Sequence, residues 1–197
     1  MRYEPKDSFY RKAKSRGYRS RAAYKLLELD RRYRILRPGD VVVDLGAWPG
    51  GWLRIAAERV GEKGRVVGVD RTPIEPLPFP WVSVVTGDIL DENVRERLRE
   101  LLGGDADVLL SDLSPRLSGV RDRDEEAMLE LVRAALEVAD RMLRRGGRGV
   151  FKLFTGSAQA EGVRALRERF SRVSTTRPEA TRRGSSELYA VAFGFRR

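Results

Sequence analysis

Short apolar runs alternate with amphipathic segments along most of the chain. The runs predict strands at residues 41–45, 65–70, 81–86, 107–111 and 148–154, and the run at 41–45 has the pattern of a central parallel strand buried on both faces. The segments between them predict helices at residues 50–60, 91–102, 123–144 and 158–169. We expect Gly146-Gly147 to end the third of these helices. Two closing runs, at residues 172–177 and 187–195, have no helix between them and predict an antiparallel strand. The alternation is typical of a doubly wound α/β sheet.

The first 37 residues differ from this pattern. They predict a short basic helix at residues 8–17 and a second helix at residues 20–33, with Ser20 as its N-cap. The sequence Pro38-Gly39-Asp40 then marks a turn. We therefore expect a basic helical extension, residues 1–37, that packs on a core domain, residues 38–197.

The charge of the chain is concentrated at its two ends. The 197 residues carry a net charge of +10. Residues 1–37 hold 13 Lys and Arg against 4 Asp and Glu, residues 171–197 hold 6 against 2, and the middle holds 20 against 23. This separation favours a polyanion held at the two ends, with Arg182 and Arg183 framing the mouth of a site. The alternative is a generic basic surface that keeps the protein in solution.

Two residue types are missing from the composition. There is no Cys and no His. These absences exclude disulfides, thiol nucleophiles, the Ser-His-Asp triad and most transition-metal sites, so we expect no metal. No apolar run approaches the roughly 20 residues of a membrane helix. Residues 1–5 lack the apolar core of a secretory signal. We expect a cytoplasmic monomer that does not bind membranes.

A glycine-rich loop follows the first predicted strand, in the sequence Asp44-Leu45-Gly46-Ala47-Trp48-Pro49-Gly50-Gly51-Trp52. Such a loop lets a ligand approach backbone N–H groups, but it matches neither the dinucleotide fingerprint nor the Walker A loop. Acidic residues stand at the ends of four predicted strands, at Asp44, Asp70, Asp88 and Asp112. They disfavour a phosphate and favour a cationic nucleoside, so we prefer S-adenosylmethionine to NAD or ATP. The alternative is that these acids only cap the helices that follow.

Lys152 lies inside a predicted strand, where lysine is rare. The chain has 33 Arg and only 6 Lys, and of the two side chains only lysine can lose its proton. This position indicates chemistry that needs a neutral amine as general base. The alternative is a buried stem whose ammonium reaches water.

These motifs together resemble the FtsJ/RrmJ (RlmE) family of ribose 2′-O-methyltransferases over nearly the whole chain. The similar stretches are residues 20–26, 44–52, 111–115, the strand of Lys152, and residues 186–189. The resemblance implies a Rossmann-like class I methyltransferase fold, with a mostly parallel seven-stranded sheet flanked by helices and an antiparallel strand at the C-terminal end. One departure is Trp48, where the family more often has a small residue, and it puts the packing near the cofactor in doubt.

The resemblance also implies the site residues. The family's catalytic tetrad matches Lys25, Asp112, Lys152 and Glu187. Its S-adenosylmethionine contacts match the glycine loop and the strand ends, at Gly46, Gly50, Gly51, Trp52, Asp70, Asp88 and Asp112. Lys152 is then the general base, Lys25 favours its neutral form, Asp112 orients it, and Glu187 holds a lysine or the ribose. Lys25 and Glu187 can instead form a structural ion pair.

The implied substrate is a uridine ribose in large-subunit (23S-type) rRNA, within the large ribosomal subunit. The alternatives are a tRNA anticodon-loop ribose 2′-O-methyltransferase, a non-catalytic RNA-binding or ribosome-assembly protein, and a small-molecule methyltransferase. The intact tetrad disfavours the binding protein, and the basic ends disfavour the small molecule. Residues 111–115 contain no aromatic side chain to stack a flipped base, which favours a ribose target over a base.

Overall fold

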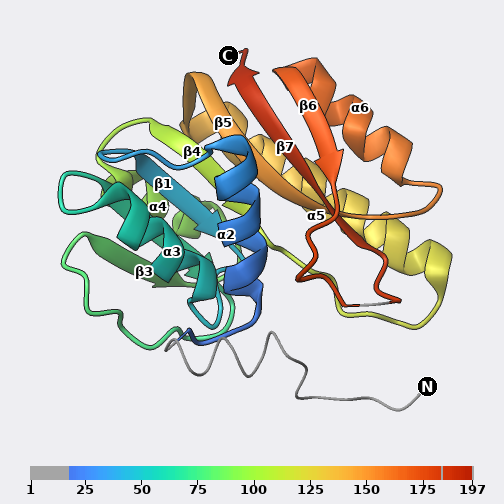
Figure 1. Cartoon of the computed structure of the whole chain (residues 1–197), viewed down its shortest axis with the longest axis horizontal. Coiled ribbons are helices and arrows are strands. Elements are labelled where there is room, and N and C mark those ends of the chain that lie inside the picture. The colour runs from blue at the N-terminus through green and yellow to red at the C-terminus, as the bar shows by residue number, and fades with distance from the viewer. Residues whose placement is uncertain (1–17, 183, 197) are drawn as a thin grey trace.

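A seven-stranded sheet with helices on both faces forms the molecule (Figure 1). The computed structural model describes residues 18–182 and 184–196. The strand order is β3-β2-β1-β4-β5-β7-β6. The elements are, in chain order, α2 Ala22–Tyr33, β1 Val41–Leu45, α3 Gly51–Val60, β2 Arg65–Asp70, β3 Val82–Thr86, α4 Glu92–Leu102, β4 Ala106–Ser111, α5 Arg121–Met142, β5 Leu143–Phe154, α6 Gln159–Arg169, β6 Phe170–Thr176 and β7 Glu187–Phe195.

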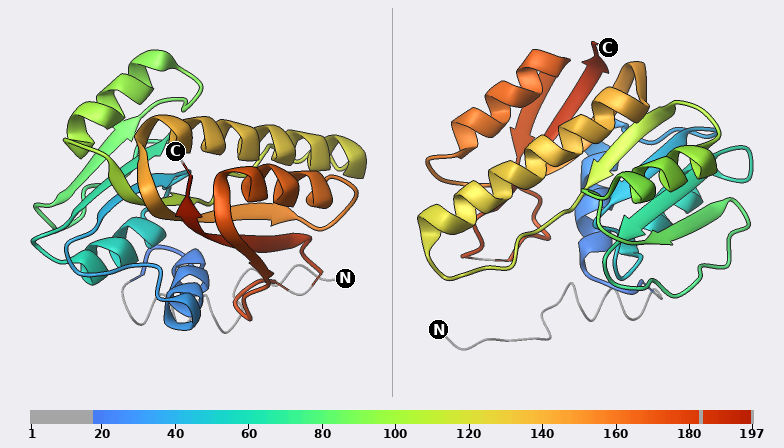
Figure 2. Two further views of the ribbon diagram at one scale, coloured as in Figure 1. Left: turned by 90° about the horizontal axis from the view of Figure 1, so that it is seen from above. Right: turned by 180° about the vertical axis from the view of Figure 1, so that it is seen from behind.

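The helices divide between the two faces of the sheet (Figure 2). Helices α2 and α3 cover one face, and α4, α5 and α6 cover the other. Alternate residues of β1 feed the two cores, since Val42 packs with α2 and α3 while Val43 and Leu45 pack with the helices opposite. Among the described residues, no helix has both the length and the apolar composition needed to cross a membrane.

Strand β7 is the one antiparallel strand among those the structure describes. It lies between β5 and β6 and is antiparallel to both, which leaves β6 at the edge of the sheet. A segment without a helix, residues 177–186, joins β6 to β7, and such a connection suits antiparallel strands because parallel neighbours need a crossover. The predicted α/β fold with an antiparallel strand at the C-terminal end is confirmed.

The start of α2 differs from the prediction. Arg21, not Ser20, is the N-cap residue, and no side chain caps this end of the helix. The Ser20 hydroxyl is instead buried against the first residue of α3, where a Cβ on Gly51 would come within 2.5 Å of it. The close packing of α2 on α3 therefore decides the position of Ser20. The helix predicted at residues 8–17 lies outside the described residues.

The prediction that Gly146-Gly147 ends the long helix is wrong. Helix α5 ends at Met142, and β5 begins at once with Leu143, which pairs with Ala106 of β4. The register between these strands shifts after that pair, and Gly146 takes a φ of 78°. The glycines therefore allow an irregular bend at the start of β5, a conformation that suits residues without a side chain.

Candidate active site

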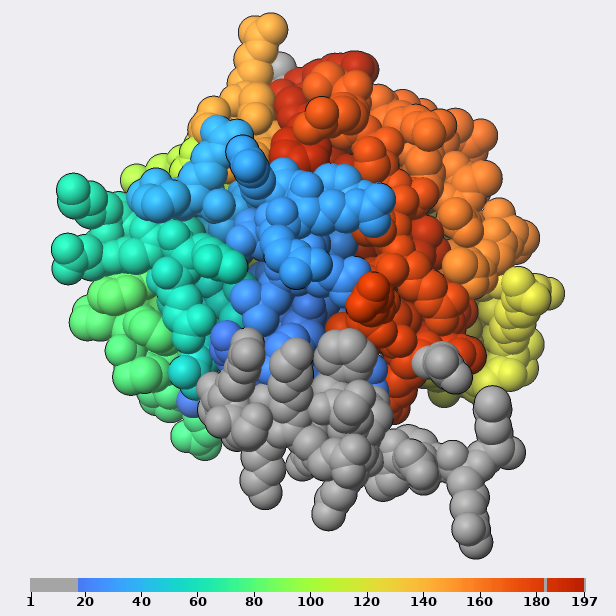
Figure 3. All heavy atoms as spheres, viewed as in Figure 1, coloured from blue at the N-terminus to red at the C-terminus, as the bar shows by residue number. Residues whose placement is uncertain are grey.

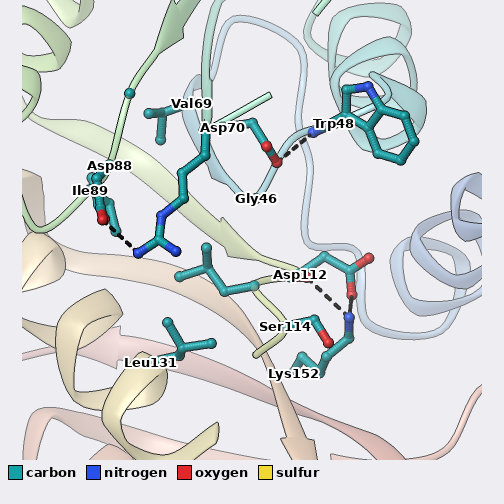
Figure 4. A pocket seen from close by; sticks show the side chains of 13 residues that line it. Gly46, Trp48, Val69, Asp70, Asp88, Ile89, Asp112, Ser114, Leu131 and Lys152 are labelled. Atoms are coloured by element: carbon teal, nitrogen blue, oxygen red, sulfur yellow. Dashed lines mark hydrogen bonds and ion pairs between the residues drawn. The ribbon is translucent and has the colours of Figure 1, made fainter. Parts of the chain in front are cut away.

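The carboxyl ends of four parallel strands open onto one cavity of about 330 Å³ (Figure 4). Gly46 after β1, Asp70 at the end of β2, Asp88 after β3 and Asp112 after β4 all line it, together with Lys152 from β5. This is the edge of an α/β sheet where ligands bind, and the volume suits a small cofactor.

Two of the acids in the cavity already hold protein groups. The Asp70 carboxylate accepts hydrogen bonds from the backbone N–H groups of Trp48, at 3.0 Å, and Thr72, at 2.8 Å. Asp88 accepts one from the N–H of Leu90 and pairs with Arg71 at 2.5 Å. The Leu90 N–H and the Arg71 guanidinium hold the pKa of Asp88 below its usual value, so this carboxylate is ionised at neutral pH.

The alternative that the strand-end acids cap the following helices is wrong. The N-cap residue of α3 is Gly50, that of α4 is Asp91, and that of α5 is Val120. None of these is a strand-end acid. Asp70, Asp88 and Asp112 therefore line the cavity without capping a helix.

Five side chains form a closed ring at one end of the cavity. Lys152 Nζ lies 2.8 Å from Asp112 Oδ1 and 3.8 Å from Glu187 Oε1, and it donates to the backbone oxygen of Asp112 at 3.0 Å. Lys25 Nζ donates to Glu187 Oε2 at 2.7 Å and to the hydroxyl of Tyr189 at 3.1 Å. That hydroxyl donates to Asp112 Oδ1 at 2.7 Å and so closes the ring.

The ring is assembled from distant parts of the chain. Lys25 comes from α2, Asp112 from the end of β4, Lys152 from β5, and Glu187 and Tyr189 from β7. Lys152 and Tyr189 are directly paired residues of neighbouring strands. The structure therefore brings together all four residues predicted for the tetrad, and we call these four with Tyr189 the catalytic ring, after the role proposed for them below.

The two lysines of the ring are shielded from water. The exposed fraction of the side chain is 9% for Lys25 and 5% for Lys152. The ammonium of Lys152 meets the Asp112 carboxylate instead of bulk water, so the alternative of a stem whose ammonium reaches water is wrong. Two cations and two carboxylates balance each other, which is what buried charges require.

Tyr189 was missed as a site residue in the sequence. Burial and the negative charges of Asp112 and Glu187 hold the pKa of its hydroxyl well above the usual value. The hydroxyl therefore keeps its proton and acts as donor to Asp112. A signal was available, because Tyr189 lies two residues after Glu187 and so shares its face of β7.

The comparisons with known proteins agree with this geometry. A family model described as FtsJ-like methyltransferase matches residues 18–195. The chain belongs to this family. It is 45% identical to "Ribosomal RNA large subunit methyltransferase E" of Anaeromyxobacter sp. over 99% of this chain and 71% of that protein. It is 40% identical to the protein of the same name from Methanobrevibacter smithii, over 96% of this chain and 90% of that protein.

Solved structures of related fold give the same result. A ribosomal RNA methyltransferase from Plasmodium falciparum superposes with a TM-score of 0.81 at 30% identity, covering 90% of this chain and 98% of that one. Aeropyrum pernix fibrillarin, solved with S-adenosyl-L-methionine natively bound, gives a TM-score of 0.59 at 18% identity over 89% and 75% of the two chains, which supports the fold alone. As a member of the FtsJ-like family, the chain is a methyltransferase whose cofactor is S-adenosylmethionine.

A buried carboxylate tests whether this cofactor fits. Asp44, two residues before Gly46, is fully buried, and neither of its oxygens has a hydrogen-bond partner among the described residues. Burial and the nearby charges of Asp112 and Asp70 raise its pKa well above the usual value. A nearby cation reduces the electrostatic cost of an unpartnered acid that lies between two other acids. S-adenosylmethionine carries two cationic groups, a sulfonium and an ammonium. The residues present therefore fit the cofactor.

Three of the predicted cofactor contacts do not line the cavity. Gly50 and Gly51 begin α3, and Trp52 is buried, with its indole N–H donating to the backbone oxygen of Ala22 at 2.8 Å. Trp52 thus ties α3 to α2, and its contact with the cofactor stays a prediction. The departure at Trp48 leaves the cavity open, because its indole points away from Asp112 and Lys152 (Figure 4).

The basic segment before α2 is described only from Tyr18 onward. Arg19 donates to the backbone oxygens of Glu75, at 2.5 Å, and Pro76, at 2.7 Å, so it fastens the loop after β2. Arg21 donates to the backbone oxygen of Ala180 and so joins α2 to the segment before β7. The basic residues earlier in the chain and Arg183 lie outside the described residues.

Proposed function

We propose that this protein transfers a methyl group from S-adenosylmethionine to the ribose 2′-OH of a uridine in large-subunit rRNA, in the cytoplasm. The observation that carries the proposal is the position of Lys152. Its amine is shielded from water, lies at the end of the cofactor cavity and is 2.8 Å from an acid that lines the same cavity. An amine placed there can take a proton from a hydroxyl that enters beside the methyl donor.

Three residues of the catalytic ring then have separate tasks. Lys152 accepts the 2′-OH proton as the oxygen attacks. Asp112 holds the Lys152 amine through both its carboxylate and its backbone oxygen, which fixes the direction of the lone pair. Lys25 shares Glu187 with Lys152, at 2.7 Å and 3.8 Å, so Glu187 holds the two amines next to each other.

The bound cofactor supplies the electrophilic methyl group, and the protein contributes mainly by positioning. The ring and the cavity would bring the methyl donor and the ribose hydroxyl together, and such positioning accounts for much of the rate gain in group transfer. A general base must start as the neutral amine, so the ring then carries one net negative charge, and the proton that Lys152 accepts makes the ring neutral beside Glu187. That carboxylate, 23% exposed, is the route by which the proton returns to water.

Ribosomal RNA is favoured over tRNA by the relatives. The proteins at 40–45% identity are named as large-subunit rRNA methyltransferases. The basic N-terminal segment, residues 1–37, is the part of the chain that we propose to grip the RNA, acting as a monomer on the large subunit. A non-catalytic RNA-binding protein would not need the complete ring, and a small-molecule enzyme would not need the basic ends.

Tritiated methyl transfer tests the proposal. Large ribosomal subunits from a strain without this modification and tRNA are offered separately with labelled S-adenosylmethionine. We expect label on the rRNA, in a nucleotide whose 3′ phosphodiester resists alkaline hydrolysis, since a methylated 2′-O cannot attack it. Label on tRNA would show that tRNA, and not rRNA, is the substrate. Label in an alkali-sensitive nucleotide would refute the ribose 2′-O target.

A matched pair of lysine variants separates chemistry from charge. Lys152→Ala should lose transfer and still bind the cofactor. Lys63→Ala removes an exposed lysine that precedes β2, at the opposite edge of the sheet, and should keep full activity. Equal activity of Lys152→Ala and the wild type would show that another group takes the proton.

A further inference from the structure

One hollow shares Lys25 and Glu187 with the catalytic ring, and a second hollow adjoins the first at Leu117, Gly184 and Ser185. The described part of the segment 177–186 runs between α2 and the N-terminal part of α5 (Figures 1 and 3), and both hollows take lining residues from it. The first hollow, of about 440 Å³, includes Arg21, Lys25, Arg182 and Glu187 in its lining. The second, of about 580 Å³, includes Arg121, Glu125, Phe154 and Arg177. Leu117 lines both.

The two hollows differ in charge. The first has three cationic side chains and one carboxylate in its lining. Burial and the neighbouring charge of Arg182 lower the pKa of Arg21. The second hollow has two arginines and two acids, with the apolar ring of Phe154 and the hydroxyl residues Ser185 and Ser186. The first therefore suits an anion, and the second suits an uncharged ring with polar edges.

Leu117 stands between the hollows as an exposed apolar side chain. It is 67% exposed, the largest exposed fraction among the large apolar side chains of the described residues, and it belongs to the lining of both hollows. Its loop is held firmly, because the Asp124 carboxylate accepts hydrogen bonds from Ser118 N at 2.7 Å, Ser118 Oγ at 2.8 Å and Gly119 N at 3.2 Å. These bonds lower the pKa of Asp124, so its carboxylate is ionised at neutral pH and keeps the hydrogen bonds that hold the loop.

We propose that the first hollow holds the phosphate on the 3′ side of the target ribose, that the second holds the base of the next nucleotide, and that Leu117 is a wedge between that base and the target base. The proposal rests on the proposed function, since it takes a ribose as the group beside Lys152. The 2′-OH and the 3′-phosphate are on adjacent carbons of one ribose. The first hollow shares Lys25 and Glu187 with the catalytic ring, so this phosphate is the one within its reach.

The wedge gives the enzyme a requirement for unstacked RNA. Apolar side chains inserted between bases separate them, and proteins that act on single nucleotides must remove the stacking neighbour. A nucleotide at the 3′ end of an RNA, or one locked in a duplex, would then be a poor substrate. The partner is single-stranded RNA that continues at least one nucleotide beyond the target.

Fluorescence of 2-aminopurine measures the wedge without methyl transfer. The probe is a seven-nucleotide single-stranded RNA with two adjacent 2-aminopurines at its centre, whose emission rises when they separate. Binding of the wild type should raise the emission. Leu117→Ala should reduce this rise at least threefold with less than a threefold change in Kd, and the exposed position of Leu117 protects the fold. Leu90→Ala, at a residue that is 56% exposed and outside both hollows, is the matched control.

A salt series tests the phosphate hollow with the same probe. Arg182→Ala should reduce the slope of log Kd against log salt by about 0.7, the loss of one phosphate contact with a single strand. Arg145→Ala, at an exposed residue near the start of β5, should leave the slope unchanged. An unchanged slope in Arg182→Ala would overturn the assignment of this hollow.

The outcomes distinguish this proposal from the proposed function. An equal rise in emission with Leu117→Ala, or no rise with the wild type, would overturn the wedge even if rRNA is methylated. Absence of 2′-O-methylation on every RNA would overturn the proposed function, and the emission would still decide whether the wedge separates bases.

Discussion

Replacing Tyr189 by Phe removes one oxygen from the centre of the catalytic ring. The Tyr189 hydroxyl links two charged groups, since it donates to Asp112 at 2.7 Å and accepts from Lys25 at 3.1 Å. Each of these keeps another partner in the variant, because Asp112 still meets Lys152 and Lys25 still meets Glu187. The ring therefore opens without leaving a charge unpaired.

The expected loss is larger in activity than in stability. A hydrogen bond to a charged group contributes about 1.5–3 kcal/mol, and an equal rise in the barrier lowers kcat by about 10- to 150-fold. Phe fills the same buried space and strands no polar atom, so the unfolding free energy should fall by only about 1–2 kcal/mol. For a domain of this size that lowers Tm by about 2–8 °C.

Steady-state methyl transfer and thermal unfolding, measured on the same samples, separate the two effects. Tyr189→Phe should lose kcat with little change in the KM for S-adenosylmethionine, because the hydroxyl positions Asp112 and Lys25 without lining the cavity. Tyr33→Phe is the control, eight residues along α2 from Lys25 and so about 12 Å away. A Tyr189→Phe enzyme that keeps kcat within twofold would refute the positioning role.

Three further variants test the charges of the site and of the fold. Lys152→Arg keeps a cation that cannot lose its proton, so turnover should fall by about 10²- to 10⁴-fold while isothermal titration still detects cofactor binding; near-normal turnover would remove Lys152 as base. The raised pKa of Asp44 means that burial of this acid costs stability once the pH exceeds its unfolded value near 3.8. Asp44→Asn should thus stabilise the free protein at pH 7 by about 1–3 kcal/mol and weaken cofactor binding. Urea unfolding should show that this gain in stability becomes smaller as the pH falls toward 4. A gain that does not depend on pH would contradict the reasoning. Arg121 and Ser157 lower the pKa of Glu125 from 4.5 to about 2, so its contribution is present above pH 4.5 and is lost as the pH falls toward 2. Glu125→Gln should flatten unfolding free energy over that range, and a curve parallel to that of the wild type would count against the pairing.

The strands and the edge of the sheet that carries the site could be predicted from the sequence. Buried parallel strands appear as continuous apolar runs, and the acids that follow them must converge because parallel strands end at one edge. Asp70, Asp88 and Asp112 meet in one cavity for this reason. Lys152 could be identified from the sequence because a charged lysine is unusual among the apolar residues of a buried strand.

The remaining features depend on tertiary contacts that periodicity does not encode. The end of α5 was misplaced because Gly146-Gly147 has the composition of a helix terminus, while the pairing of Leu143 with Ala106 decides where the strand begins. The position of Trp52 directly after the glycine loop suggested a contact with the cofactor. Its indole N–H instead donates to the backbone oxygen of Ala22 across the interface between α2 and α3. Pattern gives the type of an element more reliably than its boundaries or the partner of one side chain.

The insertion of β7 between β5 and β6 has a consequence for synthesis of the protein. The last strand along the chain supplies Glu187 and Tyr189 and also covers the inner edges of two earlier strands. A nascent chain that has reached only β6 has an incomplete catalytic ring and leaves the backbone groups of β5 open to pairing with another chain. The placement of β7 between β5 and β6 therefore completes the ring and covers the edges of both strands in a single folding event.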